Sequence, residues 1–256
     1  MSGSRILQEW KPLALGRRAG SALLGILYPP RCISCGTGTG NAHALCAACW
    51  RGINWISRPF CERLGTPFAV DIGGPLLSLS AIADPPVFAC ARAAASYDGV
   101  ARDLVHQLKF ADREDLAVAM GRLMAAAGGE MLTGESILVP IPLHWTRLWR
   151  RRFNQSAALA TEIARLRGNA LEVNLLRRVK RTRPQIGLTK SERRENLQGA
   201  FRVNAEDRHR IAGRHAVLID DVMTSSSTVN AAARILLRAG AKRVDVLTFA
   251  VVAAAQ

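Results

Sequence analysis

One run of the chain combines two carboxylates with five hydroxyl groups. Residues 217–219 are apolar, Asp220 and Asp221 follow them, and the hydroxyl residues come next: Thr224, Ser225, Ser226, Ser227 and Thr228. Two carboxylates can accept hydrogen bonds from the vicinal hydroxyls of a ribose. Hydroxyls and free backbone N–H groups at the start of a helix can donate to a phosphate. The run therefore predicts a site for a ribose 5-phosphate, and the alternative is a polar helix cap that binds no ligand.

A group of arginines follows a second apolar segment, residues 136–139. Arg147, Arg151 and Arg152 come shortly after the turn Pro140–Pro142. The planar guanidinium group donates in pairs to phosphate oxygens, so we expect these arginines to contact a phosphate. The alternative for each is a solvated surface position. No residue is assigned as catalytic, because a lone histidine such as His144 is more often structural.

Four of the six cysteines form two CxxC pairs near the N-terminus. Cys32 and Cys35 are separated by ten residues from Cys46 and Cys49. Four thiolates complete a tetrahedral zinc site with no open position, which predicts a structural Zn²⁺. A redox pair or two unrelated buried pairs are the alternatives. The absence of a disulfide-type pattern favours a reducing compartment, and we expect a cytoplasmic location.

These residues must be positioned by the elements around them. From residue 87 onward, strand-like and helix-like runs alternate, which predicts an α/β domain. We expect strands at residues 91–97, 136–139, 216–219 and 244–252, and helices at residues 116–127, 154–166 and 228–238. The predicted division is an N-terminal helix and zinc ribbon at residues 1–66, a Gly-, Pro- and Ser-rich linker at 67–86, and the α/β domain at 87–256. We expect no internal repeat.

The charge of the 256-residue chain is +15, and it is uneven. Residues 140–215 hold 18 lysines and arginines and only 6 acidic residues. Such a basic field attracts nucleic acid and small phosphorylated substrates alike, although a solvated arginine-rich surface has the same composition. No apolar run reaches the roughly 18 residues of a membrane span, so none is expected.

The polar run at residues 217–229 resembles the signature of type I phosphoribosyltransferases, an acidic pair followed by a Thr-Thr-Gly-x-Thr loop. Further segments narrow the resemblance to the ComF family, competence-associated proteins with a zinc ribbon before the transferase domain. They fit that family in order along nearly the whole chain: residues 29–32, 91–98, 108–109, 139–143, 152–156 and 196–201.

The resemblance implies a type I phosphoribosyltransferase-like parallel sheet flanked by helices, behind a small zinc ribbon. It also implies 5-phosphoribosyl-1-pyrophosphate as the ligand, bound with Mg²⁺. In this family the acidic pair binds the ribose hydroxyls, the following loop wraps the 5-phosphate, and a mobile loop closes over the substrate, here at residues 181–196. Three roles stay open: a transferase, a DNA-uptake accessory that binds single-stranded DNA or DNA-uptake proteins, and a ligand sensor without turnover.

The chain departs from the family pattern at two places. Ser226 stands where the family loop usually has glycine, which approaches a phosphate closely and takes a positive φ at no cost. The segment from Cys61 to Gly65 keeps only one cysteine of a second pair. We therefore expect one zinc ion, and the serine leaves phosphate affinity and turnover to be tested.

Overall fold

The computed structural model describes residues 29–71, 73–110, 113–182 and 189–252, except for four side chains inside helices: Arg147, Arg150, Lys190 and Arg194. The expected N-terminal helix lies outside the described residues. So do residues 183–188 of the expected closing loop.

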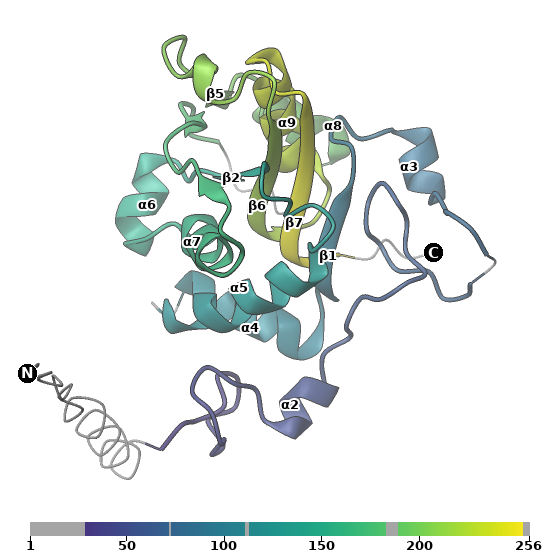
Figure 1. Ribbon diagram of the computed structural model, residues 1–256, viewed down its shortest axis with the longest axis vertical. Helices are drawn as coiled ribbons and strands as arrows, with labels where there is room; N and C mark the ends of the chain where they lie inside the picture. The colour runs from purple at the N-terminus through teal and green to yellow at the C-terminus, as the bar shows by residue number, and fades with distance from the viewer. Residues whose placement is uncertain (1–28, 72, 111–112, 183–188, 253–256) are drawn as a thin grey trace, which may run out of the picture.

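A five-stranded parallel sheet forms the centre of the molecule (Figure 1). Its strands, in the order β1-β7-β6-β2-β3, are β1 Ala91–Ser96, β7 Arg243–Val251, β6 His215–Met223, β2 Ile137–Pro140 and β3 Ala170–Leu171. Most residues of the long central strands β6 and β7 are buried, as expected for strands covered on both faces. The sheet confirms the predicted α/β class and its parallel strands.

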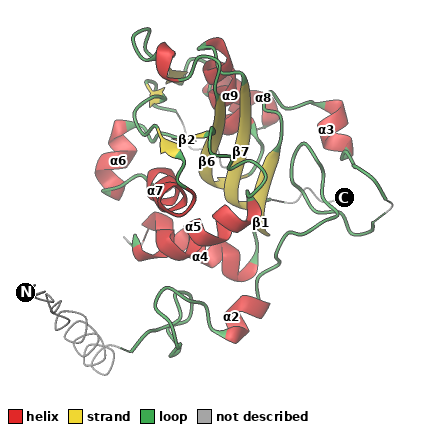
Figure 2. Ribbon diagram, in the orientation of Figure 1, coloured by secondary structure: helices red, strands yellow, loops and turns green. Residues whose placement is uncertain are grey.

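Helices cover both faces of this sheet (Figure 2). On one face lie α4 Gly99–Phe110, α5 Asp115–Ala127 and α7 Gln155–Arg167, and on the other lie α8 Lys190–Asn196 and α9 Ser227–Arg238. Side chains of β6 alternate between the two cores, because successive residues of a strand point to opposite faces. Val217 and Ile219 belong to the first core, whereas Ala216 and Leu218 belong to the second.

The order of the strands changes direction between β2 and β6. From β2 the chain crosses through α7 to the outer strand β3, whereas from β6 it crosses through α9 to β7 on the opposite side. Two neighbouring strands whose connections leave in opposite directions form a topological switch point. Ligands of open α/β sheets bind there, at the carboxyl ends of the strands.

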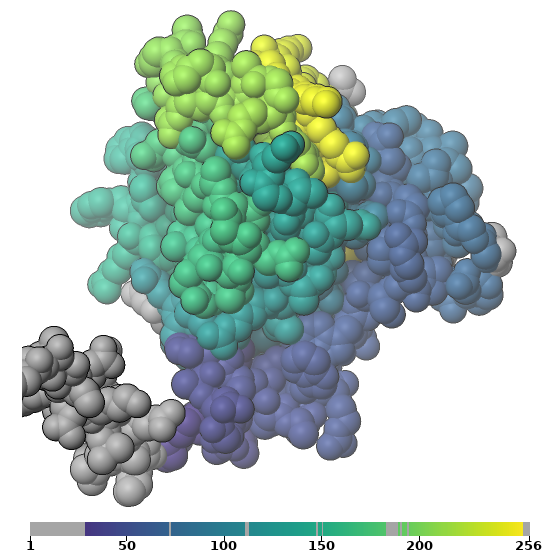
Figure 3. All heavy atoms as spheres, viewed as in Figure 1, coloured from purple at the N-terminus to yellow at the C-terminus, as the bar shows by residue number. Residues whose placement is uncertain are grey.

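Short elements complete the described part of the chain. They are α2 Ala47–Arg51, α3 Leu79–Ala83, α6 Trp145–Arg151, the 3₁₀ turn η1 Arg208–Arg210, and the antiparallel pair β4 Arg177–Arg178 and β5 Phe201–Arg202. Helix α3 lies within the segment expected to be a linker. Residues 29–90 form the lower and right margins in Figure 3, coloured purple to blue. None of the helices described combines the length and apolar composition needed to cross a bilayer.

Candidate functional site

Strand β6 carries the acidic pair to the switch point. The predicted end of this strand at Ile219 is wrong, because β7 is long enough to pair with β6 through Met223. Strand β2 ends earlier, at the pair Pro140 and Ile219. Asp220 and Asp221 therefore lie just beyond the end of β2, on the neighbouring strand β6, which continues past it.

Three elements converge on the two carboxylates. The hydroxyl of Ser156, in the first turn of α7, donates to Asp220 Oδ1 at 2.9 Å. The backbone N–H of Asp221 donates to the same oxygen at 3.0 Å. Lys109 Nζ, in the last turn of α4, lies 2.9 Å from Asp221 Oδ1. The carboxyl-terminal part of β6 thus holds two adjacent carboxylates with a lysine beside them.

The environment of Asp220 favours its protonated form. Burial raises the pKa of this carboxyl to about 7, and the negative charge of Asp221 acts in the same direction. Lys109 and the hydrogen bond from Ser156 partly oppose the rise. A cation placed between the two carboxylates would relieve the same repulsion.

The hydroxyl-rich loop joins the acidic pair to α9. Ser226 has a left-handed backbone, with φ 55° and ψ −7°, directly before the first turn of the helix. Its side chain makes no capping hydrogen bond, although it stands at the N-cap position. Ser225 Oγ lies 3.1 Å from Ser227 Oγ, and Thr224 is exposed. The Ser226 side chain therefore does not cap α9.

The predicted arginines lie on and beside α6. Arg151 Nη1 donates to Gln155 Oε1 at 3.4 Å, and its guanidinium stacks 5.1 Å from the centre of the Phe110 ring. Gln155 precedes Ser156 in the chain, so Arg151 lies one residue away from the contacts of Asp220. Arg152 is exposed at the C-cap of α6, with φ 63°. The side chain of Arg147 lies outside the described part of the chain.

Three residues at the site had no predicted role. Lys109 and Ser156 contact the carboxylates, and Gln155 is only 2% exposed. Gln155 Nε2 has no hydrogen-bond partner in the described part of the chain. All three belong to segments that carry the family resemblance. That resemblance was the available signal, because composition and spacing alone do not show which side chains reach β6.

The four-cysteine cluster forms a separate site. The Sγ atoms of Cys32, Cys35, Cys46 and Cys49 all lie within 4.8 Å of one another. Cys35 Sγ and Cys46 Sγ are 3.7 Å apart, close to the roughly 3.8 Å edge of a tetrahedron with Zn–S bonds of about 2.3 Å. The donor set and its geometry fit a structural zinc ion.

Comparisons with known proteins agree with both the N-terminal zinc ribbon and the C-terminal α/β domain. Residues 23–80 match the family described as "Double zinc ribbon domain", and residues 156–256 match "Phosphoribosyl transferase domain". The chain is 33% identical over 228 residues to the DNA utilization protein YhgH of Salmonella typhi, covering 86% of this chain and 96% of that protein. It is 29% identical over 227 residues to competence protein F of Haemophilus influenzae, covering 84% and 94%.

The fold also has a distant likeness among solved structures. The allosteric regulatory enzyme of purine biosynthesis aligns with a TM-score of 0.39 and 17% identity, covering 56% of this chain and 30% of that one. A likeness this low supports no inference about activity.

Proposed function

Because the chain belongs to the ComF family, which joins a double zinc ribbon to a phosphoribosyltransferase domain, we propose that it binds 5-phosphoribosyl-1-pyrophosphate between β2 and β6. One observation carries this proposal. The adjacent carboxylates of Asp220 and Asp221 lie at the topological switch point, directly before a hydroxyl-rich loop and an uncapped helix.

Each part of the ligand has a chemical counterpart at this edge. Asp220 and Asp221 accept from the ribose hydroxyls. The 5-phosphate lies on the loop at residues 224–228, where backbone N–H groups and hydroxyls donate to it. Gln155 supports the proposal, because its buried Nε2 has no partner among the described residues and a ligand oxygen would satisfy it.

The arginines complete the basic side of the site. Arg151 contacts Gln155, and residues 141–144 connect the end of β2 to α6. We propose that Arg151, with Arg147 and Arg152 from the same segment, contacts the pyrophosphate. Guanidinium groups suit this role because they donate to two phosphate oxygens at once.

Magnesium fits the acidic pair. Hard divalent cations prefer carboxylate oxygens, and Asp220 and Asp221 offer adjacent carboxylates whose repulsion already raises the pKa of Asp220. When bound, Mg²⁺ would neutralise charge on the pyrophosphate as that group leaves the anomeric carbon. The chain's own contribution is to hold the ribose and phosphate in place, since such a displacement requires no protein nucleophile.

Calorimetry with 5-phosphoribosyl-1-pyrophosphate and Mg²⁺ tests the proposal. Asp220→Asn with Asp221→Asn should abolish most of the affinity, because both ribose acceptors lose their charge. Ser225→Ala should cost less, because the backbone donors of the loop remain. Asp103→Asn, on the exposed face of α4, is the matched control. Equal binding by the wild type and the double variant would remove this site. Assaying pyrophosphate release across nucleobases then separates transfer from binding alone.

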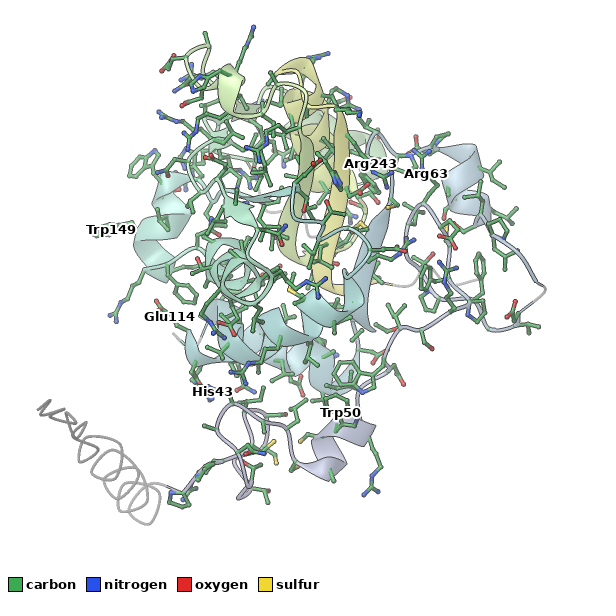
Figure 4. All side chains as sticks on the ribbon, viewed as in Figure 1. His43, Trp50, Arg63, Glu114, Trp149 and Arg243 are labelled. Carbon is green, nitrogen blue, oxygen red and sulfur yellow. The ribbon has the colours of Figure 1, made fainter. Side chains whose placement is uncertain are left out.

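A second candidate function is single-stranded DNA binding, favoured by the surface of α6. Trp145 is 71% exposed and Trp149 is 88% exposed, and Figure 4 shows Trp149 projecting away from the molecule. The two are four residues apart, so they share one face of a helix that also carries arginines. Exposed aromatic rings beside positive charge are typical of proteins that stack unpaired bases. The names of the relatives, DNA utilization protein and competence protein, agree with such a partner.

We also propose a cytoplasmic location. The structural zinc site requires four reduced thiols, and all six cysteines are unpaired. A reducing compartment keeps them available for the metal.

A further inference from the structure

The backbone around Cys61 repeats the backbone around Cys32. The N–H of Cys32 donates to the carbonyl of Thr37 at 2.7 Å, and the N–H of Gly36 donates back to Cys32 at 3.0 Å. The turn that begins at Cys61 has the corresponding two hydrogen bonds. The N–H of Cys61 donates to the carbonyl of Thr66 at 2.8 Å, and the N–H of Gly65 donates to the carbonyl of Cys61 at 2.7 Å. The fourth residue after each cysteine is a glycine with positive φ, 78° at Gly36 and 66° at Gly65.

The correspondence continues outward on both sides of the turn. An antiparallel bridge joins Arg31 to Gly38 in the first copy and Phe60 to Pro67 in the second. In both copies, the bridge joins the residue directly before the cysteine to the residue six positions after the cysteine. The next hydrogen bond outward also recurs. The N–H of Thr39 donates to the carbonyl of Pro30 at 2.8 Å, and the N–H of Phe68 donates to the carbonyl of Pro59 at 3.0 Å.

The second half of the ribbon repeats as well. The N–H of Cys46 donates to Cys32 Sγ at 3.3 Å, and the N–H of Ser78 donates to Cys61 Sγ at 3.3 Å. Cys46 caps the five-residue helix α2, and Ser78 caps the five-residue helix α3. In each helix the residue three positions after the cap donates its N–H back to the capping side chain, at 3.4 and 3.3 Å.

This alignment identifies what stands at each ligand position of the second copy. Cys61 corresponds to Cys32, and the other three thiolates are replaced by side chains that make poor zinc ligands or none: Leu64, Ser78 and Ala81. A structural zinc site needs four donors, usually thiolates and imidazoles. In the described part of the chain, only the first copy gathers a metal-binding group. The second copy therefore does not fit the zinc ion that a double zinc ribbon implies.

Other interactions occupy the place of the missing ion. Cys61 is fully buried, and its Sγ accepts from both the N–H and the hydroxyl of Ser78 at 3.3 Å, and from the N–H of Leu64 at 3.5 Å. Leu64 packs against the core on the α9 face of the sheet, and Ala81 is 4% exposed. Thiol-centred hydrogen bonds and apolar contacts thus replace the coordination bonds.

The second copy is also attached to the edge strand β1. The N–H of Ala91 donates to the carbonyl of Arg63 at 2.9 Å, and Arg63 Nη2 donates to the carbonyl of Phe88 at 2.9 Å. Gly65 lies so close that an added Cβ would be 2.5 Å from the carbonyl oxygen of Ala91. Arg92 of β1 pairs with Glu62 at 2.9 Å. Docking against the sheet stabilises this turn where the first copy depends on metal.

We infer that residues 58–84 are a second zinc ribbon that folds without metal, held by the buried Cys61 thiol and by its contact with β1. The chain then binds one zinc ion, not two, and its ribbon module extends to Asp84. The expectation of no internal repeat is wrong, because backbone hydrogen bonds carry the repeat. In the second copy, three of the four positions that correspond to zinc ligands hold another residue type. The segment between Leu64 and Ser78 is three residues longer than the segment between Cys35 and Cys46.

Zinc content of the purified full-length chain tests this inference. The wild type should hold about one zinc per chain, Cys46→Ser should hold almost none, and Cys61→Ala should keep about one. The triple variant Leu64→Cys/Ser78→Cys/Ala81→Cys should hold about two, and adding Cys61→Ala to it should weaken the binding of the second ion, because three thiolates then remain. Cobalt substitution gives an independent reading, because each thiolate site adds ligand-to-metal absorption.

Three results would overturn the inference: two zinc ions in the wild type, loss of zinc on Cys61→Ala, or a folded triple variant that gains no metal. If the triple variant does not fold, Ser78→Cys/Ala81→Cys keeps the packed Leu64 and offers three thiolates. This double variant should then gain Cd²⁺ or Zn²⁺ over the wild type, and a folded double variant without that gain contradicts the alignment.

Discussion

The Asp220 carboxyl links the candidate site to pH. Its pKa in the folded chain is raised to about 7, mainly by burial. Between the ordinary aspartate value and this one, the folded chain binds more protons than the unfolded chain. The contribution of Asp220 to the free energy of unfolding should therefore fall as pH rises from about 4 to about 7, and stay level above about pH 7.

Thermal unfolding of the wild type and Asp220→Asn from pH 5.5 to 8 measures this effect. The difference in stability between them should shift against the wild type as pH rises, and added Mg²⁺ should reduce the shift if it binds the carboxylate. Zinc-ligand protonation is common to both proteins and cancels in the comparison. A difference that stays constant across this range would show that Asp220 has an ordinary pKa.

The left-handed backbone of Ser226 is less favourable for serine than it would be for glycine, which has no Cβ. A left-handed backbone costs a residue with a Cβ about 1–2 kcal/mol, and the freedom of glycine in the unfolded chain offsets about 0.5–1 kcal/mol of that. Ser226→Gly should therefore raise the free energy of unfolding by up to about 1 kcal/mol, measured by denaturant titration. Ser225→Gly is the matched control, because Ser225 has a negative φ and should lose stability instead.

The same substitution tests the loop's part in ligand binding. If the Ser226 side chain crowds the 5-phosphate, Ser226→Gly should tighten binding of 5-phosphoribosyl-1-pyrophosphate. If the hydroxyl donates to the phosphate, the substitution should weaken binding while still stabilising the fold. A variant that is no more stable than the wild type would contradict the cost assigned to φ 55°.

At the scale of elements, α6 is unusual because its large apolar side chains face solvent. Trp145→Ala with Trp149→Ala should weaken binding of a single-stranded oligonucleotide by about 1–3 kcal/mol for each base that stacks. Fluorescence anisotropy of a labelled oligonucleotide measures the loss. It should affect DNA binding and leave zinc content unchanged, because α6 is distant in sequence from the four cysteines.

Two controls separate stacking from charge in this test. Trp145→Phe with Trp149→Phe should keep most of the affinity, because phenylalanine retains an aromatic face. The affinity of every variant should fall steeply with salt, because the arginines release counterions from the phosphates. Binding that ignores both the alanine substitutions and salt would remove nucleic acid as a partner of this helix.

The two ribbons show how an element can keep its backbone after its ligands are lost. In the first, α2 is capped by a cysteine that also belongs to the metal cluster. In the second, α3 is capped by a serine whose hydroxyl contacts the remaining thiol. Serine keeps the cap because its oxygen accepts from the helix N–H as sulfur does, but it does not replace a thiolate as a zinc ligand.

At the scale of the whole molecule, strand order brings the site together. Lys109, Ser156 and Asp220 come from three elements far apart in the chain, yet they meet because α4 and α7 cover the same face beside β6. The net charge of the chain is +15, although the site itself holds two carboxylates. An anionic ligand is attracted by this field, and the acidic pair then selects for a diol or a bound cation.

The local patterns of the chain were sufficient for the features that depend on neighbours in sequence. The paired CxxC spacing indicated the metal cluster, and the alternation of strand-like and helix-like runs indicated the α/β domain. The run from Asp220 to Thr228 indicated where carboxylates and donors occur together. Each is a short-range property, because a tight turn, a strand or a helix start is built from consecutive residues.

Contacts between distant segments were decided only by the tertiary structure. The sequence does not show that β6 extends to Met223, because that length depends on β7. It does not show that Lys109 reaches Asp221, or that a cysteine, a leucine, a serine and an alanine form a second ribbon. Backbone hydrogen bonds and docking on β1 carry that ribbon, and backbone groups are the same in every residue type. A repeat held by them keeps its backbone even where three of the four ligand side chains differ.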